Sequence, residues 1–204
     1  MSTVLDVRNL SMHYETLAGN VSAVKDVSFS INSGESFGLV GESGCGKSSV
    51  AMTLLQLQPE NSVITEGSIK LDGKELVGLS EYELRKVRWD SISIVFQGAM
   101  NAWNPVIKIG EQIREALREH YPNNSKEENI RKIQELFQMV GLDESTIDRY
   151  PHELSGGMKQ RAVIALALSC DPKIIIADEP TTALDVVIQD QILNEIKNCL
   201  LYTS

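Results

Sequence analysis

Glycine, lysine and serine recur in one short segment at a spacing that suits the binding of phosphate groups. The segment fits the pattern G-x-x-x-x-G-K-[ST], and its residues are Gly41, Glu42, Ser43, Gly44, Cys45, Gly46, Lys47 and Ser48. Glycines let the backbone turn tightly and point successive N–H groups at an anion, and a following helix adds its positive end. Lys47 would reach the β- and γ-phosphates of a nucleotide, and the Ser48 hydroxyl would hold Mg²⁺. The neighbouring Ser49 is included among the binding residues, and the alternative is a glycine-rich turn with a solvated lysine.

Two acidic residues follow a short apolar run later in the chain. Residues 174–177 are three isoleucines and an alanine, which predict a strand, and Asp178 and Glu179 come directly after them. Asp178 suits a Mg²⁺ ligand, direct or through water, and Glu179 could polarise the water that attacks a γ-phosphate. The alternative is a solvated turn before Pro180. Together with the phosphate loop, the pair indicates nucleotide hydrolysis.

A second anion site is indicated by Ser155, Gly156 and Gly157, which precede a predicted helix. A hydroxyl, backbone N–H groups and a helix N-terminus then converge on one point. A second anion site needs a second phosphate-bearing partner. The alternative is a serine that caps the helix, followed by glycines needed for packing.

The elements that must position these segments follow from hydrophobic periodicity and capping signals. Strands are predicted within residues 4–31, at 37–40 directly before the phosphate loop, and at 67–71, 92–96 and 174–177. Helices are predicted at 49–58, 81–88, 109–120, 126–140, 157–169 and from 186 onward. Ser80 with Glu83 and Ser125 with Glu128 form capping boxes for two of them, and Gly141 ends the second of these.

These elements predict an α/β fold that begins with a run of strands. The helices between about residues 109 and 140 interrupt the alternation of strands and helices. We therefore expect one domain over residues 1–204, with a helical subdomain inserted at approximately residues 98–155.

Composition restricts the function further. A formal net charge of −9 argues against DNA or RNA as the main partner. The three cysteines, Cys45, Cys170 and Cys199, show no metal or disulfide spacing and favour a reducing compartment. Residues 1–9 lack the apolar core of a secretory signal, and the longest strongly apolar stretch, residues 162–170, is too short to span a bilayer.

Residues 154–161, with the sequence LSGGMKQR, resemble the signature motif of ATP-binding-cassette ATPases. The resemblance covers most of residues 5–196. It implies the ABC ATPase fold, in which a phosphate-loop NTPase core follows an N-terminal antiparallel β-subdomain, with ATP and Mg²⁺ as cofactors. It also implies that Ser155, Gly156 and Gly157 contact the γ-phosphate of an ATP held by a second subunit, arranged head to tail. The second subunit could be identical or different.

The roles of three further residues are implied by this resemblance alone. Gln97 matches the glutamine that senses the γ-phosphate and Mg²⁺ and couples to the membrane partner, although it could be only a polar residue at a strand end. Asp185, in the sequence Ala-Leu-Asp at 183–185, matches the loop that crosses the dimer interface, unless it only caps a helix. Tyr14 lies where the family stacks an aromatic ring on adenine, unless it is a strand residue alternating with Leu10 and Met12.

Within the family, three segments resemble the oligopeptide, dipeptide and nickel importer branch: residues 41–44, 104–106 and 150–153. Gly98, where an acidic residue usually follows the glutamine, departs from the pattern and leaves the substrate open, sugars included. The resemblance implies an ATPase at the cytoplasmic face of the membrane that works with permease subunits and, indirectly, a substrate-binding protein. The alternatives are a non-transport ATPase with the same cassette and a nucleotide-binding module without catalysis.

The family places a histidine at the end of a strand after the catalytic glutamate, and none of His13, His120 and His152 falls there. We therefore expect the domain to be incomplete at its C-terminus and the 204-residue chain to bind ATP but hydrolyse it poorly. The sequence of residues 199–204 does not continue the polar pattern of the preceding predicted helix, so the origin of this segment stays open.

Overall fold

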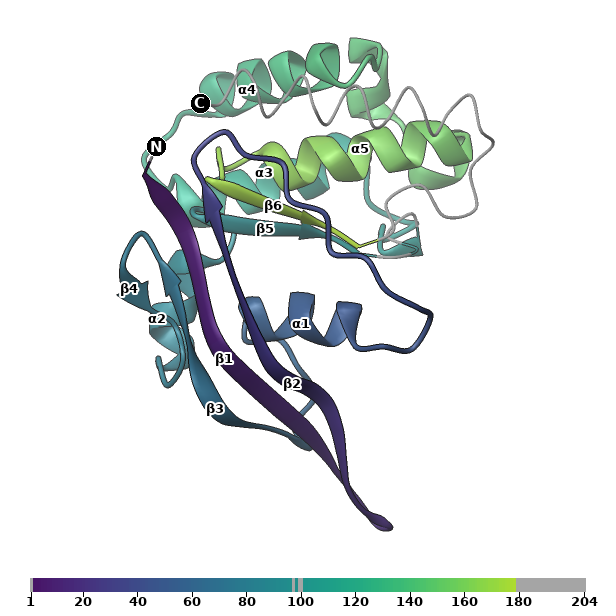
Figure 1. The fold of residues 1–204 in the computed structure, drawn as a ribbon. Coiled ribbons are helices and arrows are strands. Elements are labelled where there is room, and N and C mark those ends of the chain that lie inside the picture. The colour runs from purple at the N-terminus through teal and green to yellow at the C-terminus, as the bar shows by residue number, and fades with distance from the viewer. Residues whose placement is uncertain (1, 97, 99–100, 179–204) are drawn as a thin grey trace. The chain divides into compact units, whose positions relative to one another are not determined.

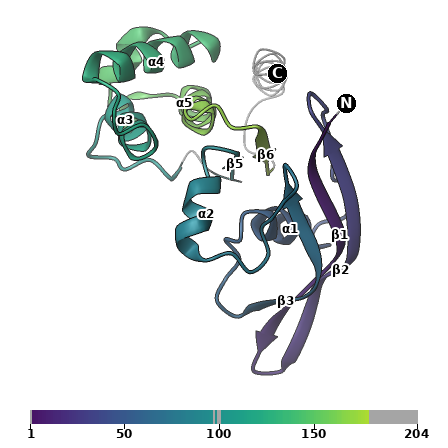
Figure 2. The same ribbon diagram turned by 90° about the vertical axis from the view of Figure 1, so that its left-hand side faces the viewer.

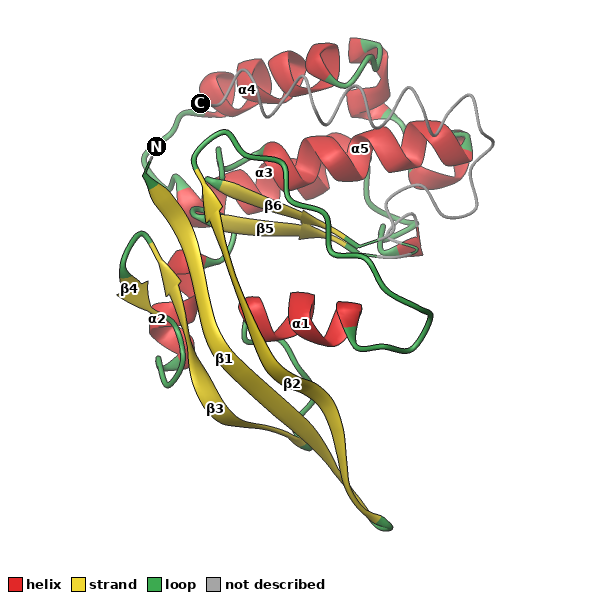
Figure 3. Ribbon diagram, in the orientation of Figure 1, coloured by secondary structure: helices red, strands yellow, loops and turns green. Residues whose placement is uncertain are grey.

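The computed structural model describes residues 2–96, 98 and 101–178, coloured along the chain in Figure 1 and by secondary structure in Figure 3. Contacts divide the chain into two compact units, Met1–Arg88 and Trp89–Ser204.

The first unit is built on an antiparallel sheet with the strand order β2-β1-β3-β4 (Figure 1). Its strands are β1 (Thr3–Thr16), β2 (Gly19–Asn32), β3 (Ser62–Leu71) and β4 (Lys74–Glu75). Alternating apolar residues of these strands are almost fully buried on one face of the sheet, among them Leu5, Val7, Leu10, Met12 and Ile69. The predicted N-terminal antiparallel β-subdomain is therefore confirmed.

The register of the long hairpin is set by irregularities at its middle. Asn9 and Asp26 both adopt left-handed backbone conformations, and Asn9 Nδ2 donates a hydrogen bond to Asp26 Oδ1 at 2.8 Å. On the neighbouring strand, Gly67 has φ +108°, and a Cβ there would lie 2.6 Å from Leu10 Cα. Only glycine permits this approach, so the bulged strands fit in one alignment.

Two helices complete the first unit. Helix α1 (Lys47–Leu54) follows the phosphate loop and packs on β2, and α2 (Glu81–Val87) begins at the predicted capping box of Ser80 and Glu83. The Arg88 guanidinium donates to the carbonyls of Leu55 at 2.9 Å and Gln56 at 2.7 Å. These bonds join the end of α2 to the end of α1.

The strand predicted at residues 37–40 is wrong. Residues 35–40 form no regular structure, and the Phe37, Leu39 and Val40 side chains are exposed, Val40 by 93%. An apolar run becomes a buried strand only where a neighbouring strand accepts its backbone hydrogen bonds. Within the part of the chain that the structure describes, no strand pairs with this segment, and Phe37 instead stacks on Phe29 of β2 at 4.9 Å.

The second unit contains two parallel strands, β5 (Ile92–Val95) and β6 (Ile174–Ala177), paired in register from Ile92 with Ile174 to Val95 with Ala177. Helix α5 (Gly156–Leu168) contacts β5, α3 (Ile109–His120) and α4 (Lys126–Met139). Figure 2 views α5 end-on, between the strands and the other two helices. The short helices η2 (Glu144–Asp148) and η3 (Pro151–Glu153) lead into α5.

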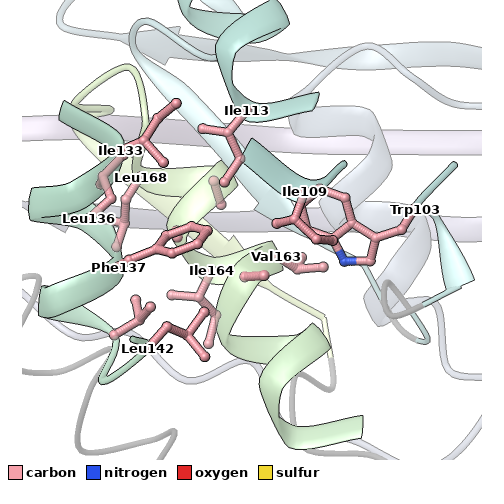
Figure 4. Close-up of a cluster of buried hydrophobic side chains, with 14 of the residues drawn as sticks. Trp103, Ile109, Ile113, Ile133, Leu136, Phe137, Leu142, Val163, Ile164 and Leu168 are labelled. Carbon is pink, nitrogen blue, oxygen red and sulfur yellow. The ribbon is translucent and has the colours of Figure 1, made fainter. Parts of the chain in front are cut away.

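The core of this unit is formed by side chains from α3, α4 and α5 that point toward one another (Figure 4). Ile113, Ile133 and Phe137 have no exposed surface. Helix α4 begins at the predicted capping box of Ser125 and Glu128, and Gly141, with φ +67°, follows its end. The predicted helices are thus present in the described residues up to Leu168, while the boundaries of an inserted helical subdomain stay a prediction.

Candidate functional site

The phosphate loop lies against strand β2 at one glycine. Gly46 has φ +98°, and a Cβ added there would lie 2.2 Å from the Ala23 carbonyl oxygen. A second tight contact lies inside the loop, where a Cβ on Gly41 would lie 2.5 Å from Cys45 Sγ. Gly46 is therefore required by a backbone contact as well as by its conformation, whereas the contact at Gly41 is with a side chain.

The first turn of α1 offers hydrogen-bond donors and contains no acidic side chain beside them. Its N-cap is Gly46, so no side chain caps the helix, and its first turn contains no acidic residue. Lys47 Nζ turns back over the loop and donates to the carbonyls of Gly41 at 2.8 Å and Glu42 at 2.7 Å. Ser48 is exposed in the same turn. A helix start with uncapped N–H groups, a cation and a hydroxyl is suited to binding an anion.

Tyr14 and Ser49, both predicted as binding residues, are brought together. The Tyr14 hydroxyl and Ser49 Oγ share a hydrogen bond of 3.0 Å, although 35 positions separate them in the chain. Tyr14 lies on β1, where it pairs with Val21 of β2 and Ser62 of β3. The hydroxyl of this aromatic side chain is therefore hydrogen-bonded to the first turn of the helix that follows the phosphate loop.

Asp178 lies directly after β6, as predicted. Its backbone N–H donates to the carbonyl of Val95 at 2.9 Å, which continues the pairing of β5 and β6 by one residue. The residue is half-buried at the carboxyl end of this parallel pair. Ligand-binding residues of parallel sheets are found at this end of the strands.

Ser155 caps helix α5, and its Oγ accepts a hydrogen bond from the N–H of Met158 at 3.3 Å. Ser155 and Gly156 are exposed, Gly157 is half-buried, and the first turn contains no acidic residue. The buried Trp103 supports this turn, because its Nε1 donates to the Lys159 carbonyl at 3.4 Å. The helix start can accept an anion while its serine remains in place as the cap.

The remaining predicted site residues, Gln97, Glu179 and Asp185, lie outside the described residues. Two residues that support the candidate site were not predicted from the sequence. The carbonyl of Ala23 touches the phosphate loop, and the Trp103 indole supports the start of α5. Neither residue belongs to a motif, and each acts on a segment more than twenty positions away, so no local signal could have revealed it.

Among the described residues, no group of three or more histidine, cysteine, aspartate or glutamate side chains could hold a metal ion. Cys45 is exposed in the phosphate loop, and Cys170 is buried as a free thiol. In the same part of the chain, no helix has both the length and the apolar character needed to cross a bilayer.

A comparison with protein families matches residues 24–182 to the ABC transporter family model, which is well over half of the chain. The chain belongs to the ABC transporter family. The phosphate loop, Asp178 and the signature residues 154–161 all lie inside the matched range.

Several curated members of the ABC transporter family are similar to the chain. It is 47% identical over 193 residues to the dipeptide transport ATP-binding protein DppD of Lactococcus lactis, covering 94% of this chain and 55% of that protein. It is 47% identical over 201 residues to the oligopeptide transport ATP-binding protein AppD of Bacillus subtilis, covering 97% and 61%. The chain thus spans between 55% and 61% of the length of these two relatives.

Solved structures of ABC transporter cassettes share the fold. The dimeric structure of the cassette MJ0796 matches with a TM-score of 0.85 and 32% identity, covering 97% of this chain and 83% of that chain. A dimeric post-hydrolysis state of MJ0796, bound to ADP and phosphate, matches with a TM-score of 0.84 at 32% identity. The predicted ABC ATPase fold is therefore confirmed.

Proposed function

We propose that this protein is the ATP-binding and ATP-hydrolysing subunit of an ABC importer for di- or oligopeptides. The single observation that carries the proposal is the phosphate loop, with Gly46 against β2, Lys47 over the loop carbonyls and α1 uncapped. The peptide class rests on relatives such as the dipeptide and oligopeptide transport proteins, which are 47% identical. A nickel substrate, considered from the sequence, does not appear in the names of these two relatives.

The residues of the loop fit the phosphates of ATP. The backbone N–H groups of residues 41–48 and the Lys47 ammonium would hold the β- and γ-phosphates, and Tyr14 would stack on the adenine ring. Ser48 and Asp178, with Gln97 from outside the described residues, would hold Mg²⁺. When bound, Mg²⁺ neutralises charge that develops on the phosphoryl oxygens. Glu179 would accept a proton from the attacking water.

A second ATPase subunit would complete each site. The exposed start of α5, with Ser155, Gly156 and Gly157, would contact the γ-phosphate held by the partner, and Asp185 would lie at the interface. Support comes from the dimeric form of the cassette MJ0796. Permease subunits would anchor the pair at the cytoplasmic face of the membrane, and a substrate-binding protein would deliver the peptide from the other side.

Nucleotide binding is the first step to test. Titration calorimetry of the 204-residue chain with MgATP should show binding that Lys47→Ala weakens by at least tenfold, because a charge-assisted phosphate contact is lost. Lys25→Ala, a change of the same type on β2, should leave binding within twofold. If the two substitutions have equal effects, the phosphate loop does not bind the nucleotide.

Hydrolysis and pairing can be tested at Glu179. In a chain extended to the full length of its relatives, Glu179→Gln keeps the size of the side chain but removes the proton acceptor, so phosphate release should fall by about 10²–10⁴-fold. The same variant should elute as a dimer in gel filtration with MgATP and as a monomer without it. Unchanged turnover would refute the role of Glu179, and pairing independent of ATP would refute the composite site.

A non-transport ABC ATPase is the competing function. The relatives do not favour it, because those compared are transport proteins by name. Co-purification distinguishes the two functions, since an importer subunit should be retained by permease subunits encoded beside it. A non-transport ATPase should not be retained.

A further inference from the structure

Trp103 is a buried side chain in an otherwise exposed part of a loop. It is 7% exposed, whereas the described residues beside it, 101, 102 and 104–106, are all exposed. The ring belongs to the helical core together with Ile109 and Val163 (Figure 4). Its Nε1 donates a hydrogen bond to the carbonyl of Lys159 at 3.4 Å, which gives the polar atom of the buried ring a partner. One side chain thus connects this loop to the beginning of α5.

The backbone directly after Trp103 is held by the side chain of Gln112 on α3. The N–H of Asn104 donates to Gln112 Oε1 at 2.9 Å. Gln112 Nε2 donates in return to the carbonyls of Asn104 at 3.0 Å and Ile107 at 2.8 Å. A single amide thus serves as both acceptor and donor for the loop. The loop cannot move along α3 without breaking these bonds, so the indole extends from a fixed point.

The first turn of α5 has few contacts of its own to hold it in place. Gly156 and Gly157 have no side chains to pack, and glycine loses more conformational freedom on folding than any other residue. The cap bond from the Met158 N–H to Ser155 Oγ is long, at 3.3 Å. The Lys159 N–H donates to the Ser155 carbonyl at 2.9 Å, so the residue that accepts from the indole is bonded directly to the cap residue.

We propose that Trp103 is a positioning residue that acts on the site of the partner subunit. Through Lys159 it would set the direction in which Ser155, Gly156 and Gly157 face the partner's nucleotide. The phosphate loop of its own chain belongs to the other compact unit. This inference rests on the proposed composite site. A binding group that is misplaced by about 1 Å can lower a rate a hundredfold, so a contact that never touches the ligand can still control turnover.

The test places Trp103→Phe on one chosen subunit of a mixed pair, in chains extended to the full length of the relatives. A Lys47→Ala chain can supply only the signature residues, and a Ser155→Arg chain only the phosphate loop, so their pair contains one working site. Trp103→Phe removes the Nε1 donor and keeps an aromatic ring in the core. On the Lys47→Ala chain it should lower phosphate release by roughly two- to tenfold, the range for one neutral hydrogen bond. On the Ser155→Arg chain it should leave phosphate release unchanged.

Two further variants accompany this test. Trp89→Phe makes the same change at the other tryptophan and, on the Lys47→Ala chain, should leave phosphate release unchanged. Gln112→Ala frees the loop from α3 at a half-buried position, so it tests the inference without removing a core side chain. It should lower phosphate release only on the Lys47→Ala chain, as Trp103→Phe does. Thermal unfolding verifies that each variant is folded.

Equal losses with Trp103→Phe on either chain would overturn the inference, because a general loss of stability has no preferred subunit. Unchanged phosphate release on both chains would overturn it as well. In either case the activity gained on mixing Lys47→Ala and Ser155→Arg chains would still support the composite site. If that mixture gains no activity over either chain alone, the composite site and this inference fail together.

Discussion

At position 46 only a hydrogen atom fits between the phosphate loop and strand β2. The backbone there has φ +98°, and a Cβ would lie 2.2 Å from the Ala23 carbonyl oxygen. Because that oxygen belongs to the backbone of a paired strand, it cannot move aside as a flexible side chain would. The second glycine of the pattern is thus required by the strand beside it.

We predict that Gly46→Ala destabilises the protein more than Gly73→Ala does. Gly73 also has a positive φ, +77°, but nothing lies within 4 Å of its added Cβ. Gly73→Ala should cost about 1–2 kcal/mol for the left-handed backbone alone. Gly46→Ala adds overpacking of about 1–3 kcal/mol. Denaturant unfolding measures both, and equal losses would contradict the contact with Ala23.

The sequence predicted the binding residues of the loop but not what supports them. Lys47 and Ser48 follow from a pattern that is complete within eight positions. The hydrogen bond between Tyr14 and Ser49 joins residues 35 positions apart. It depends on the pairing register of β1, which is shifted by bulges in that strand. No local pattern reports such a register.

Among the elements, the two helices with capping boxes begin at the predicted residues. Ser125 Oγ accepts the N–H of Glu128 at 3.1 Å, and the Glu128 carboxylate accepts the N–H of Ser125 at 2.6 Å. Both partners lie within one turn, so the start of α4 can be predicted from neighbouring residues. The strand expected at residues 37–40 was wrong because strand formation depends on a partner far away in sequence.

We predict that Ser125→Ala lowers the free energy of unfolding by about 1 kcal/mol, since it leaves an N–H at the start of α4 without its acceptor. Ser125→Asp, which retains an acceptor at the N-cap, should recover most of the loss. Urea unfolding monitored by circular dichroism would measure both variants. A stable Ser125→Ala would show that the cap adds nothing to α4.

The same capping box predicts a pH dependence. The backbone hydrogen bond from Ser125 holds the pKa of Glu128 below its usual value. A depressed carboxyl pKa stabilises the fold above the unfolded pKa, and this stabilisation is lost as pH falls through the folded pKa. Glu128→Gln should therefore be less stable than wild type at pH 7, and the difference should shrink below about pH 4. Glu127→Gln, in the same turn, controls for the loss of one charge.

At the scale of the molecule, the helical core of the second unit contains the largest fully buried side chain of the described residues. Phe137 of α4 has no exposed surface and lies among residues of α3 and α5 (Figure 4). Phe137→Ala should cost about 3–5 kcal/mol, because the cavity cannot collapse fully. Met139→Ala, at a position 41% exposed on the same helix, should cost much less. Equal losses in thermal unfolding would contradict the packing of α4.

If two identical chains form the composite site, defective chains should complement each other. Lys47→Ala removes the phosphate-binding cation of one chain, and Ser155→Arg blocks the signature residues 154–161 of the other. In a symmetric pair each site uses one segment from each subunit, so a mixed pair contains one intact site. In chains extended to the full length of the relatives, phosphate release by the mixture should exceed that of either variant alone. No gain on mixing would exclude a homodimeric site with this arrangement.

The indole of Trp103 has a practical consequence. It is buried and donates to the carbonyl of Lys159, in the segment that would touch the partner's nucleotide. The chain contains only two tryptophans, so Trp89→Phe would leave a single emitter at the start of α5. Any rearrangement of this turn that lets water reach the indole should shift its fluorescence to longer wavelength. The Trp89→Phe variant would thus report on residues 154–161 through its own fluorescence, in real time and without a dye.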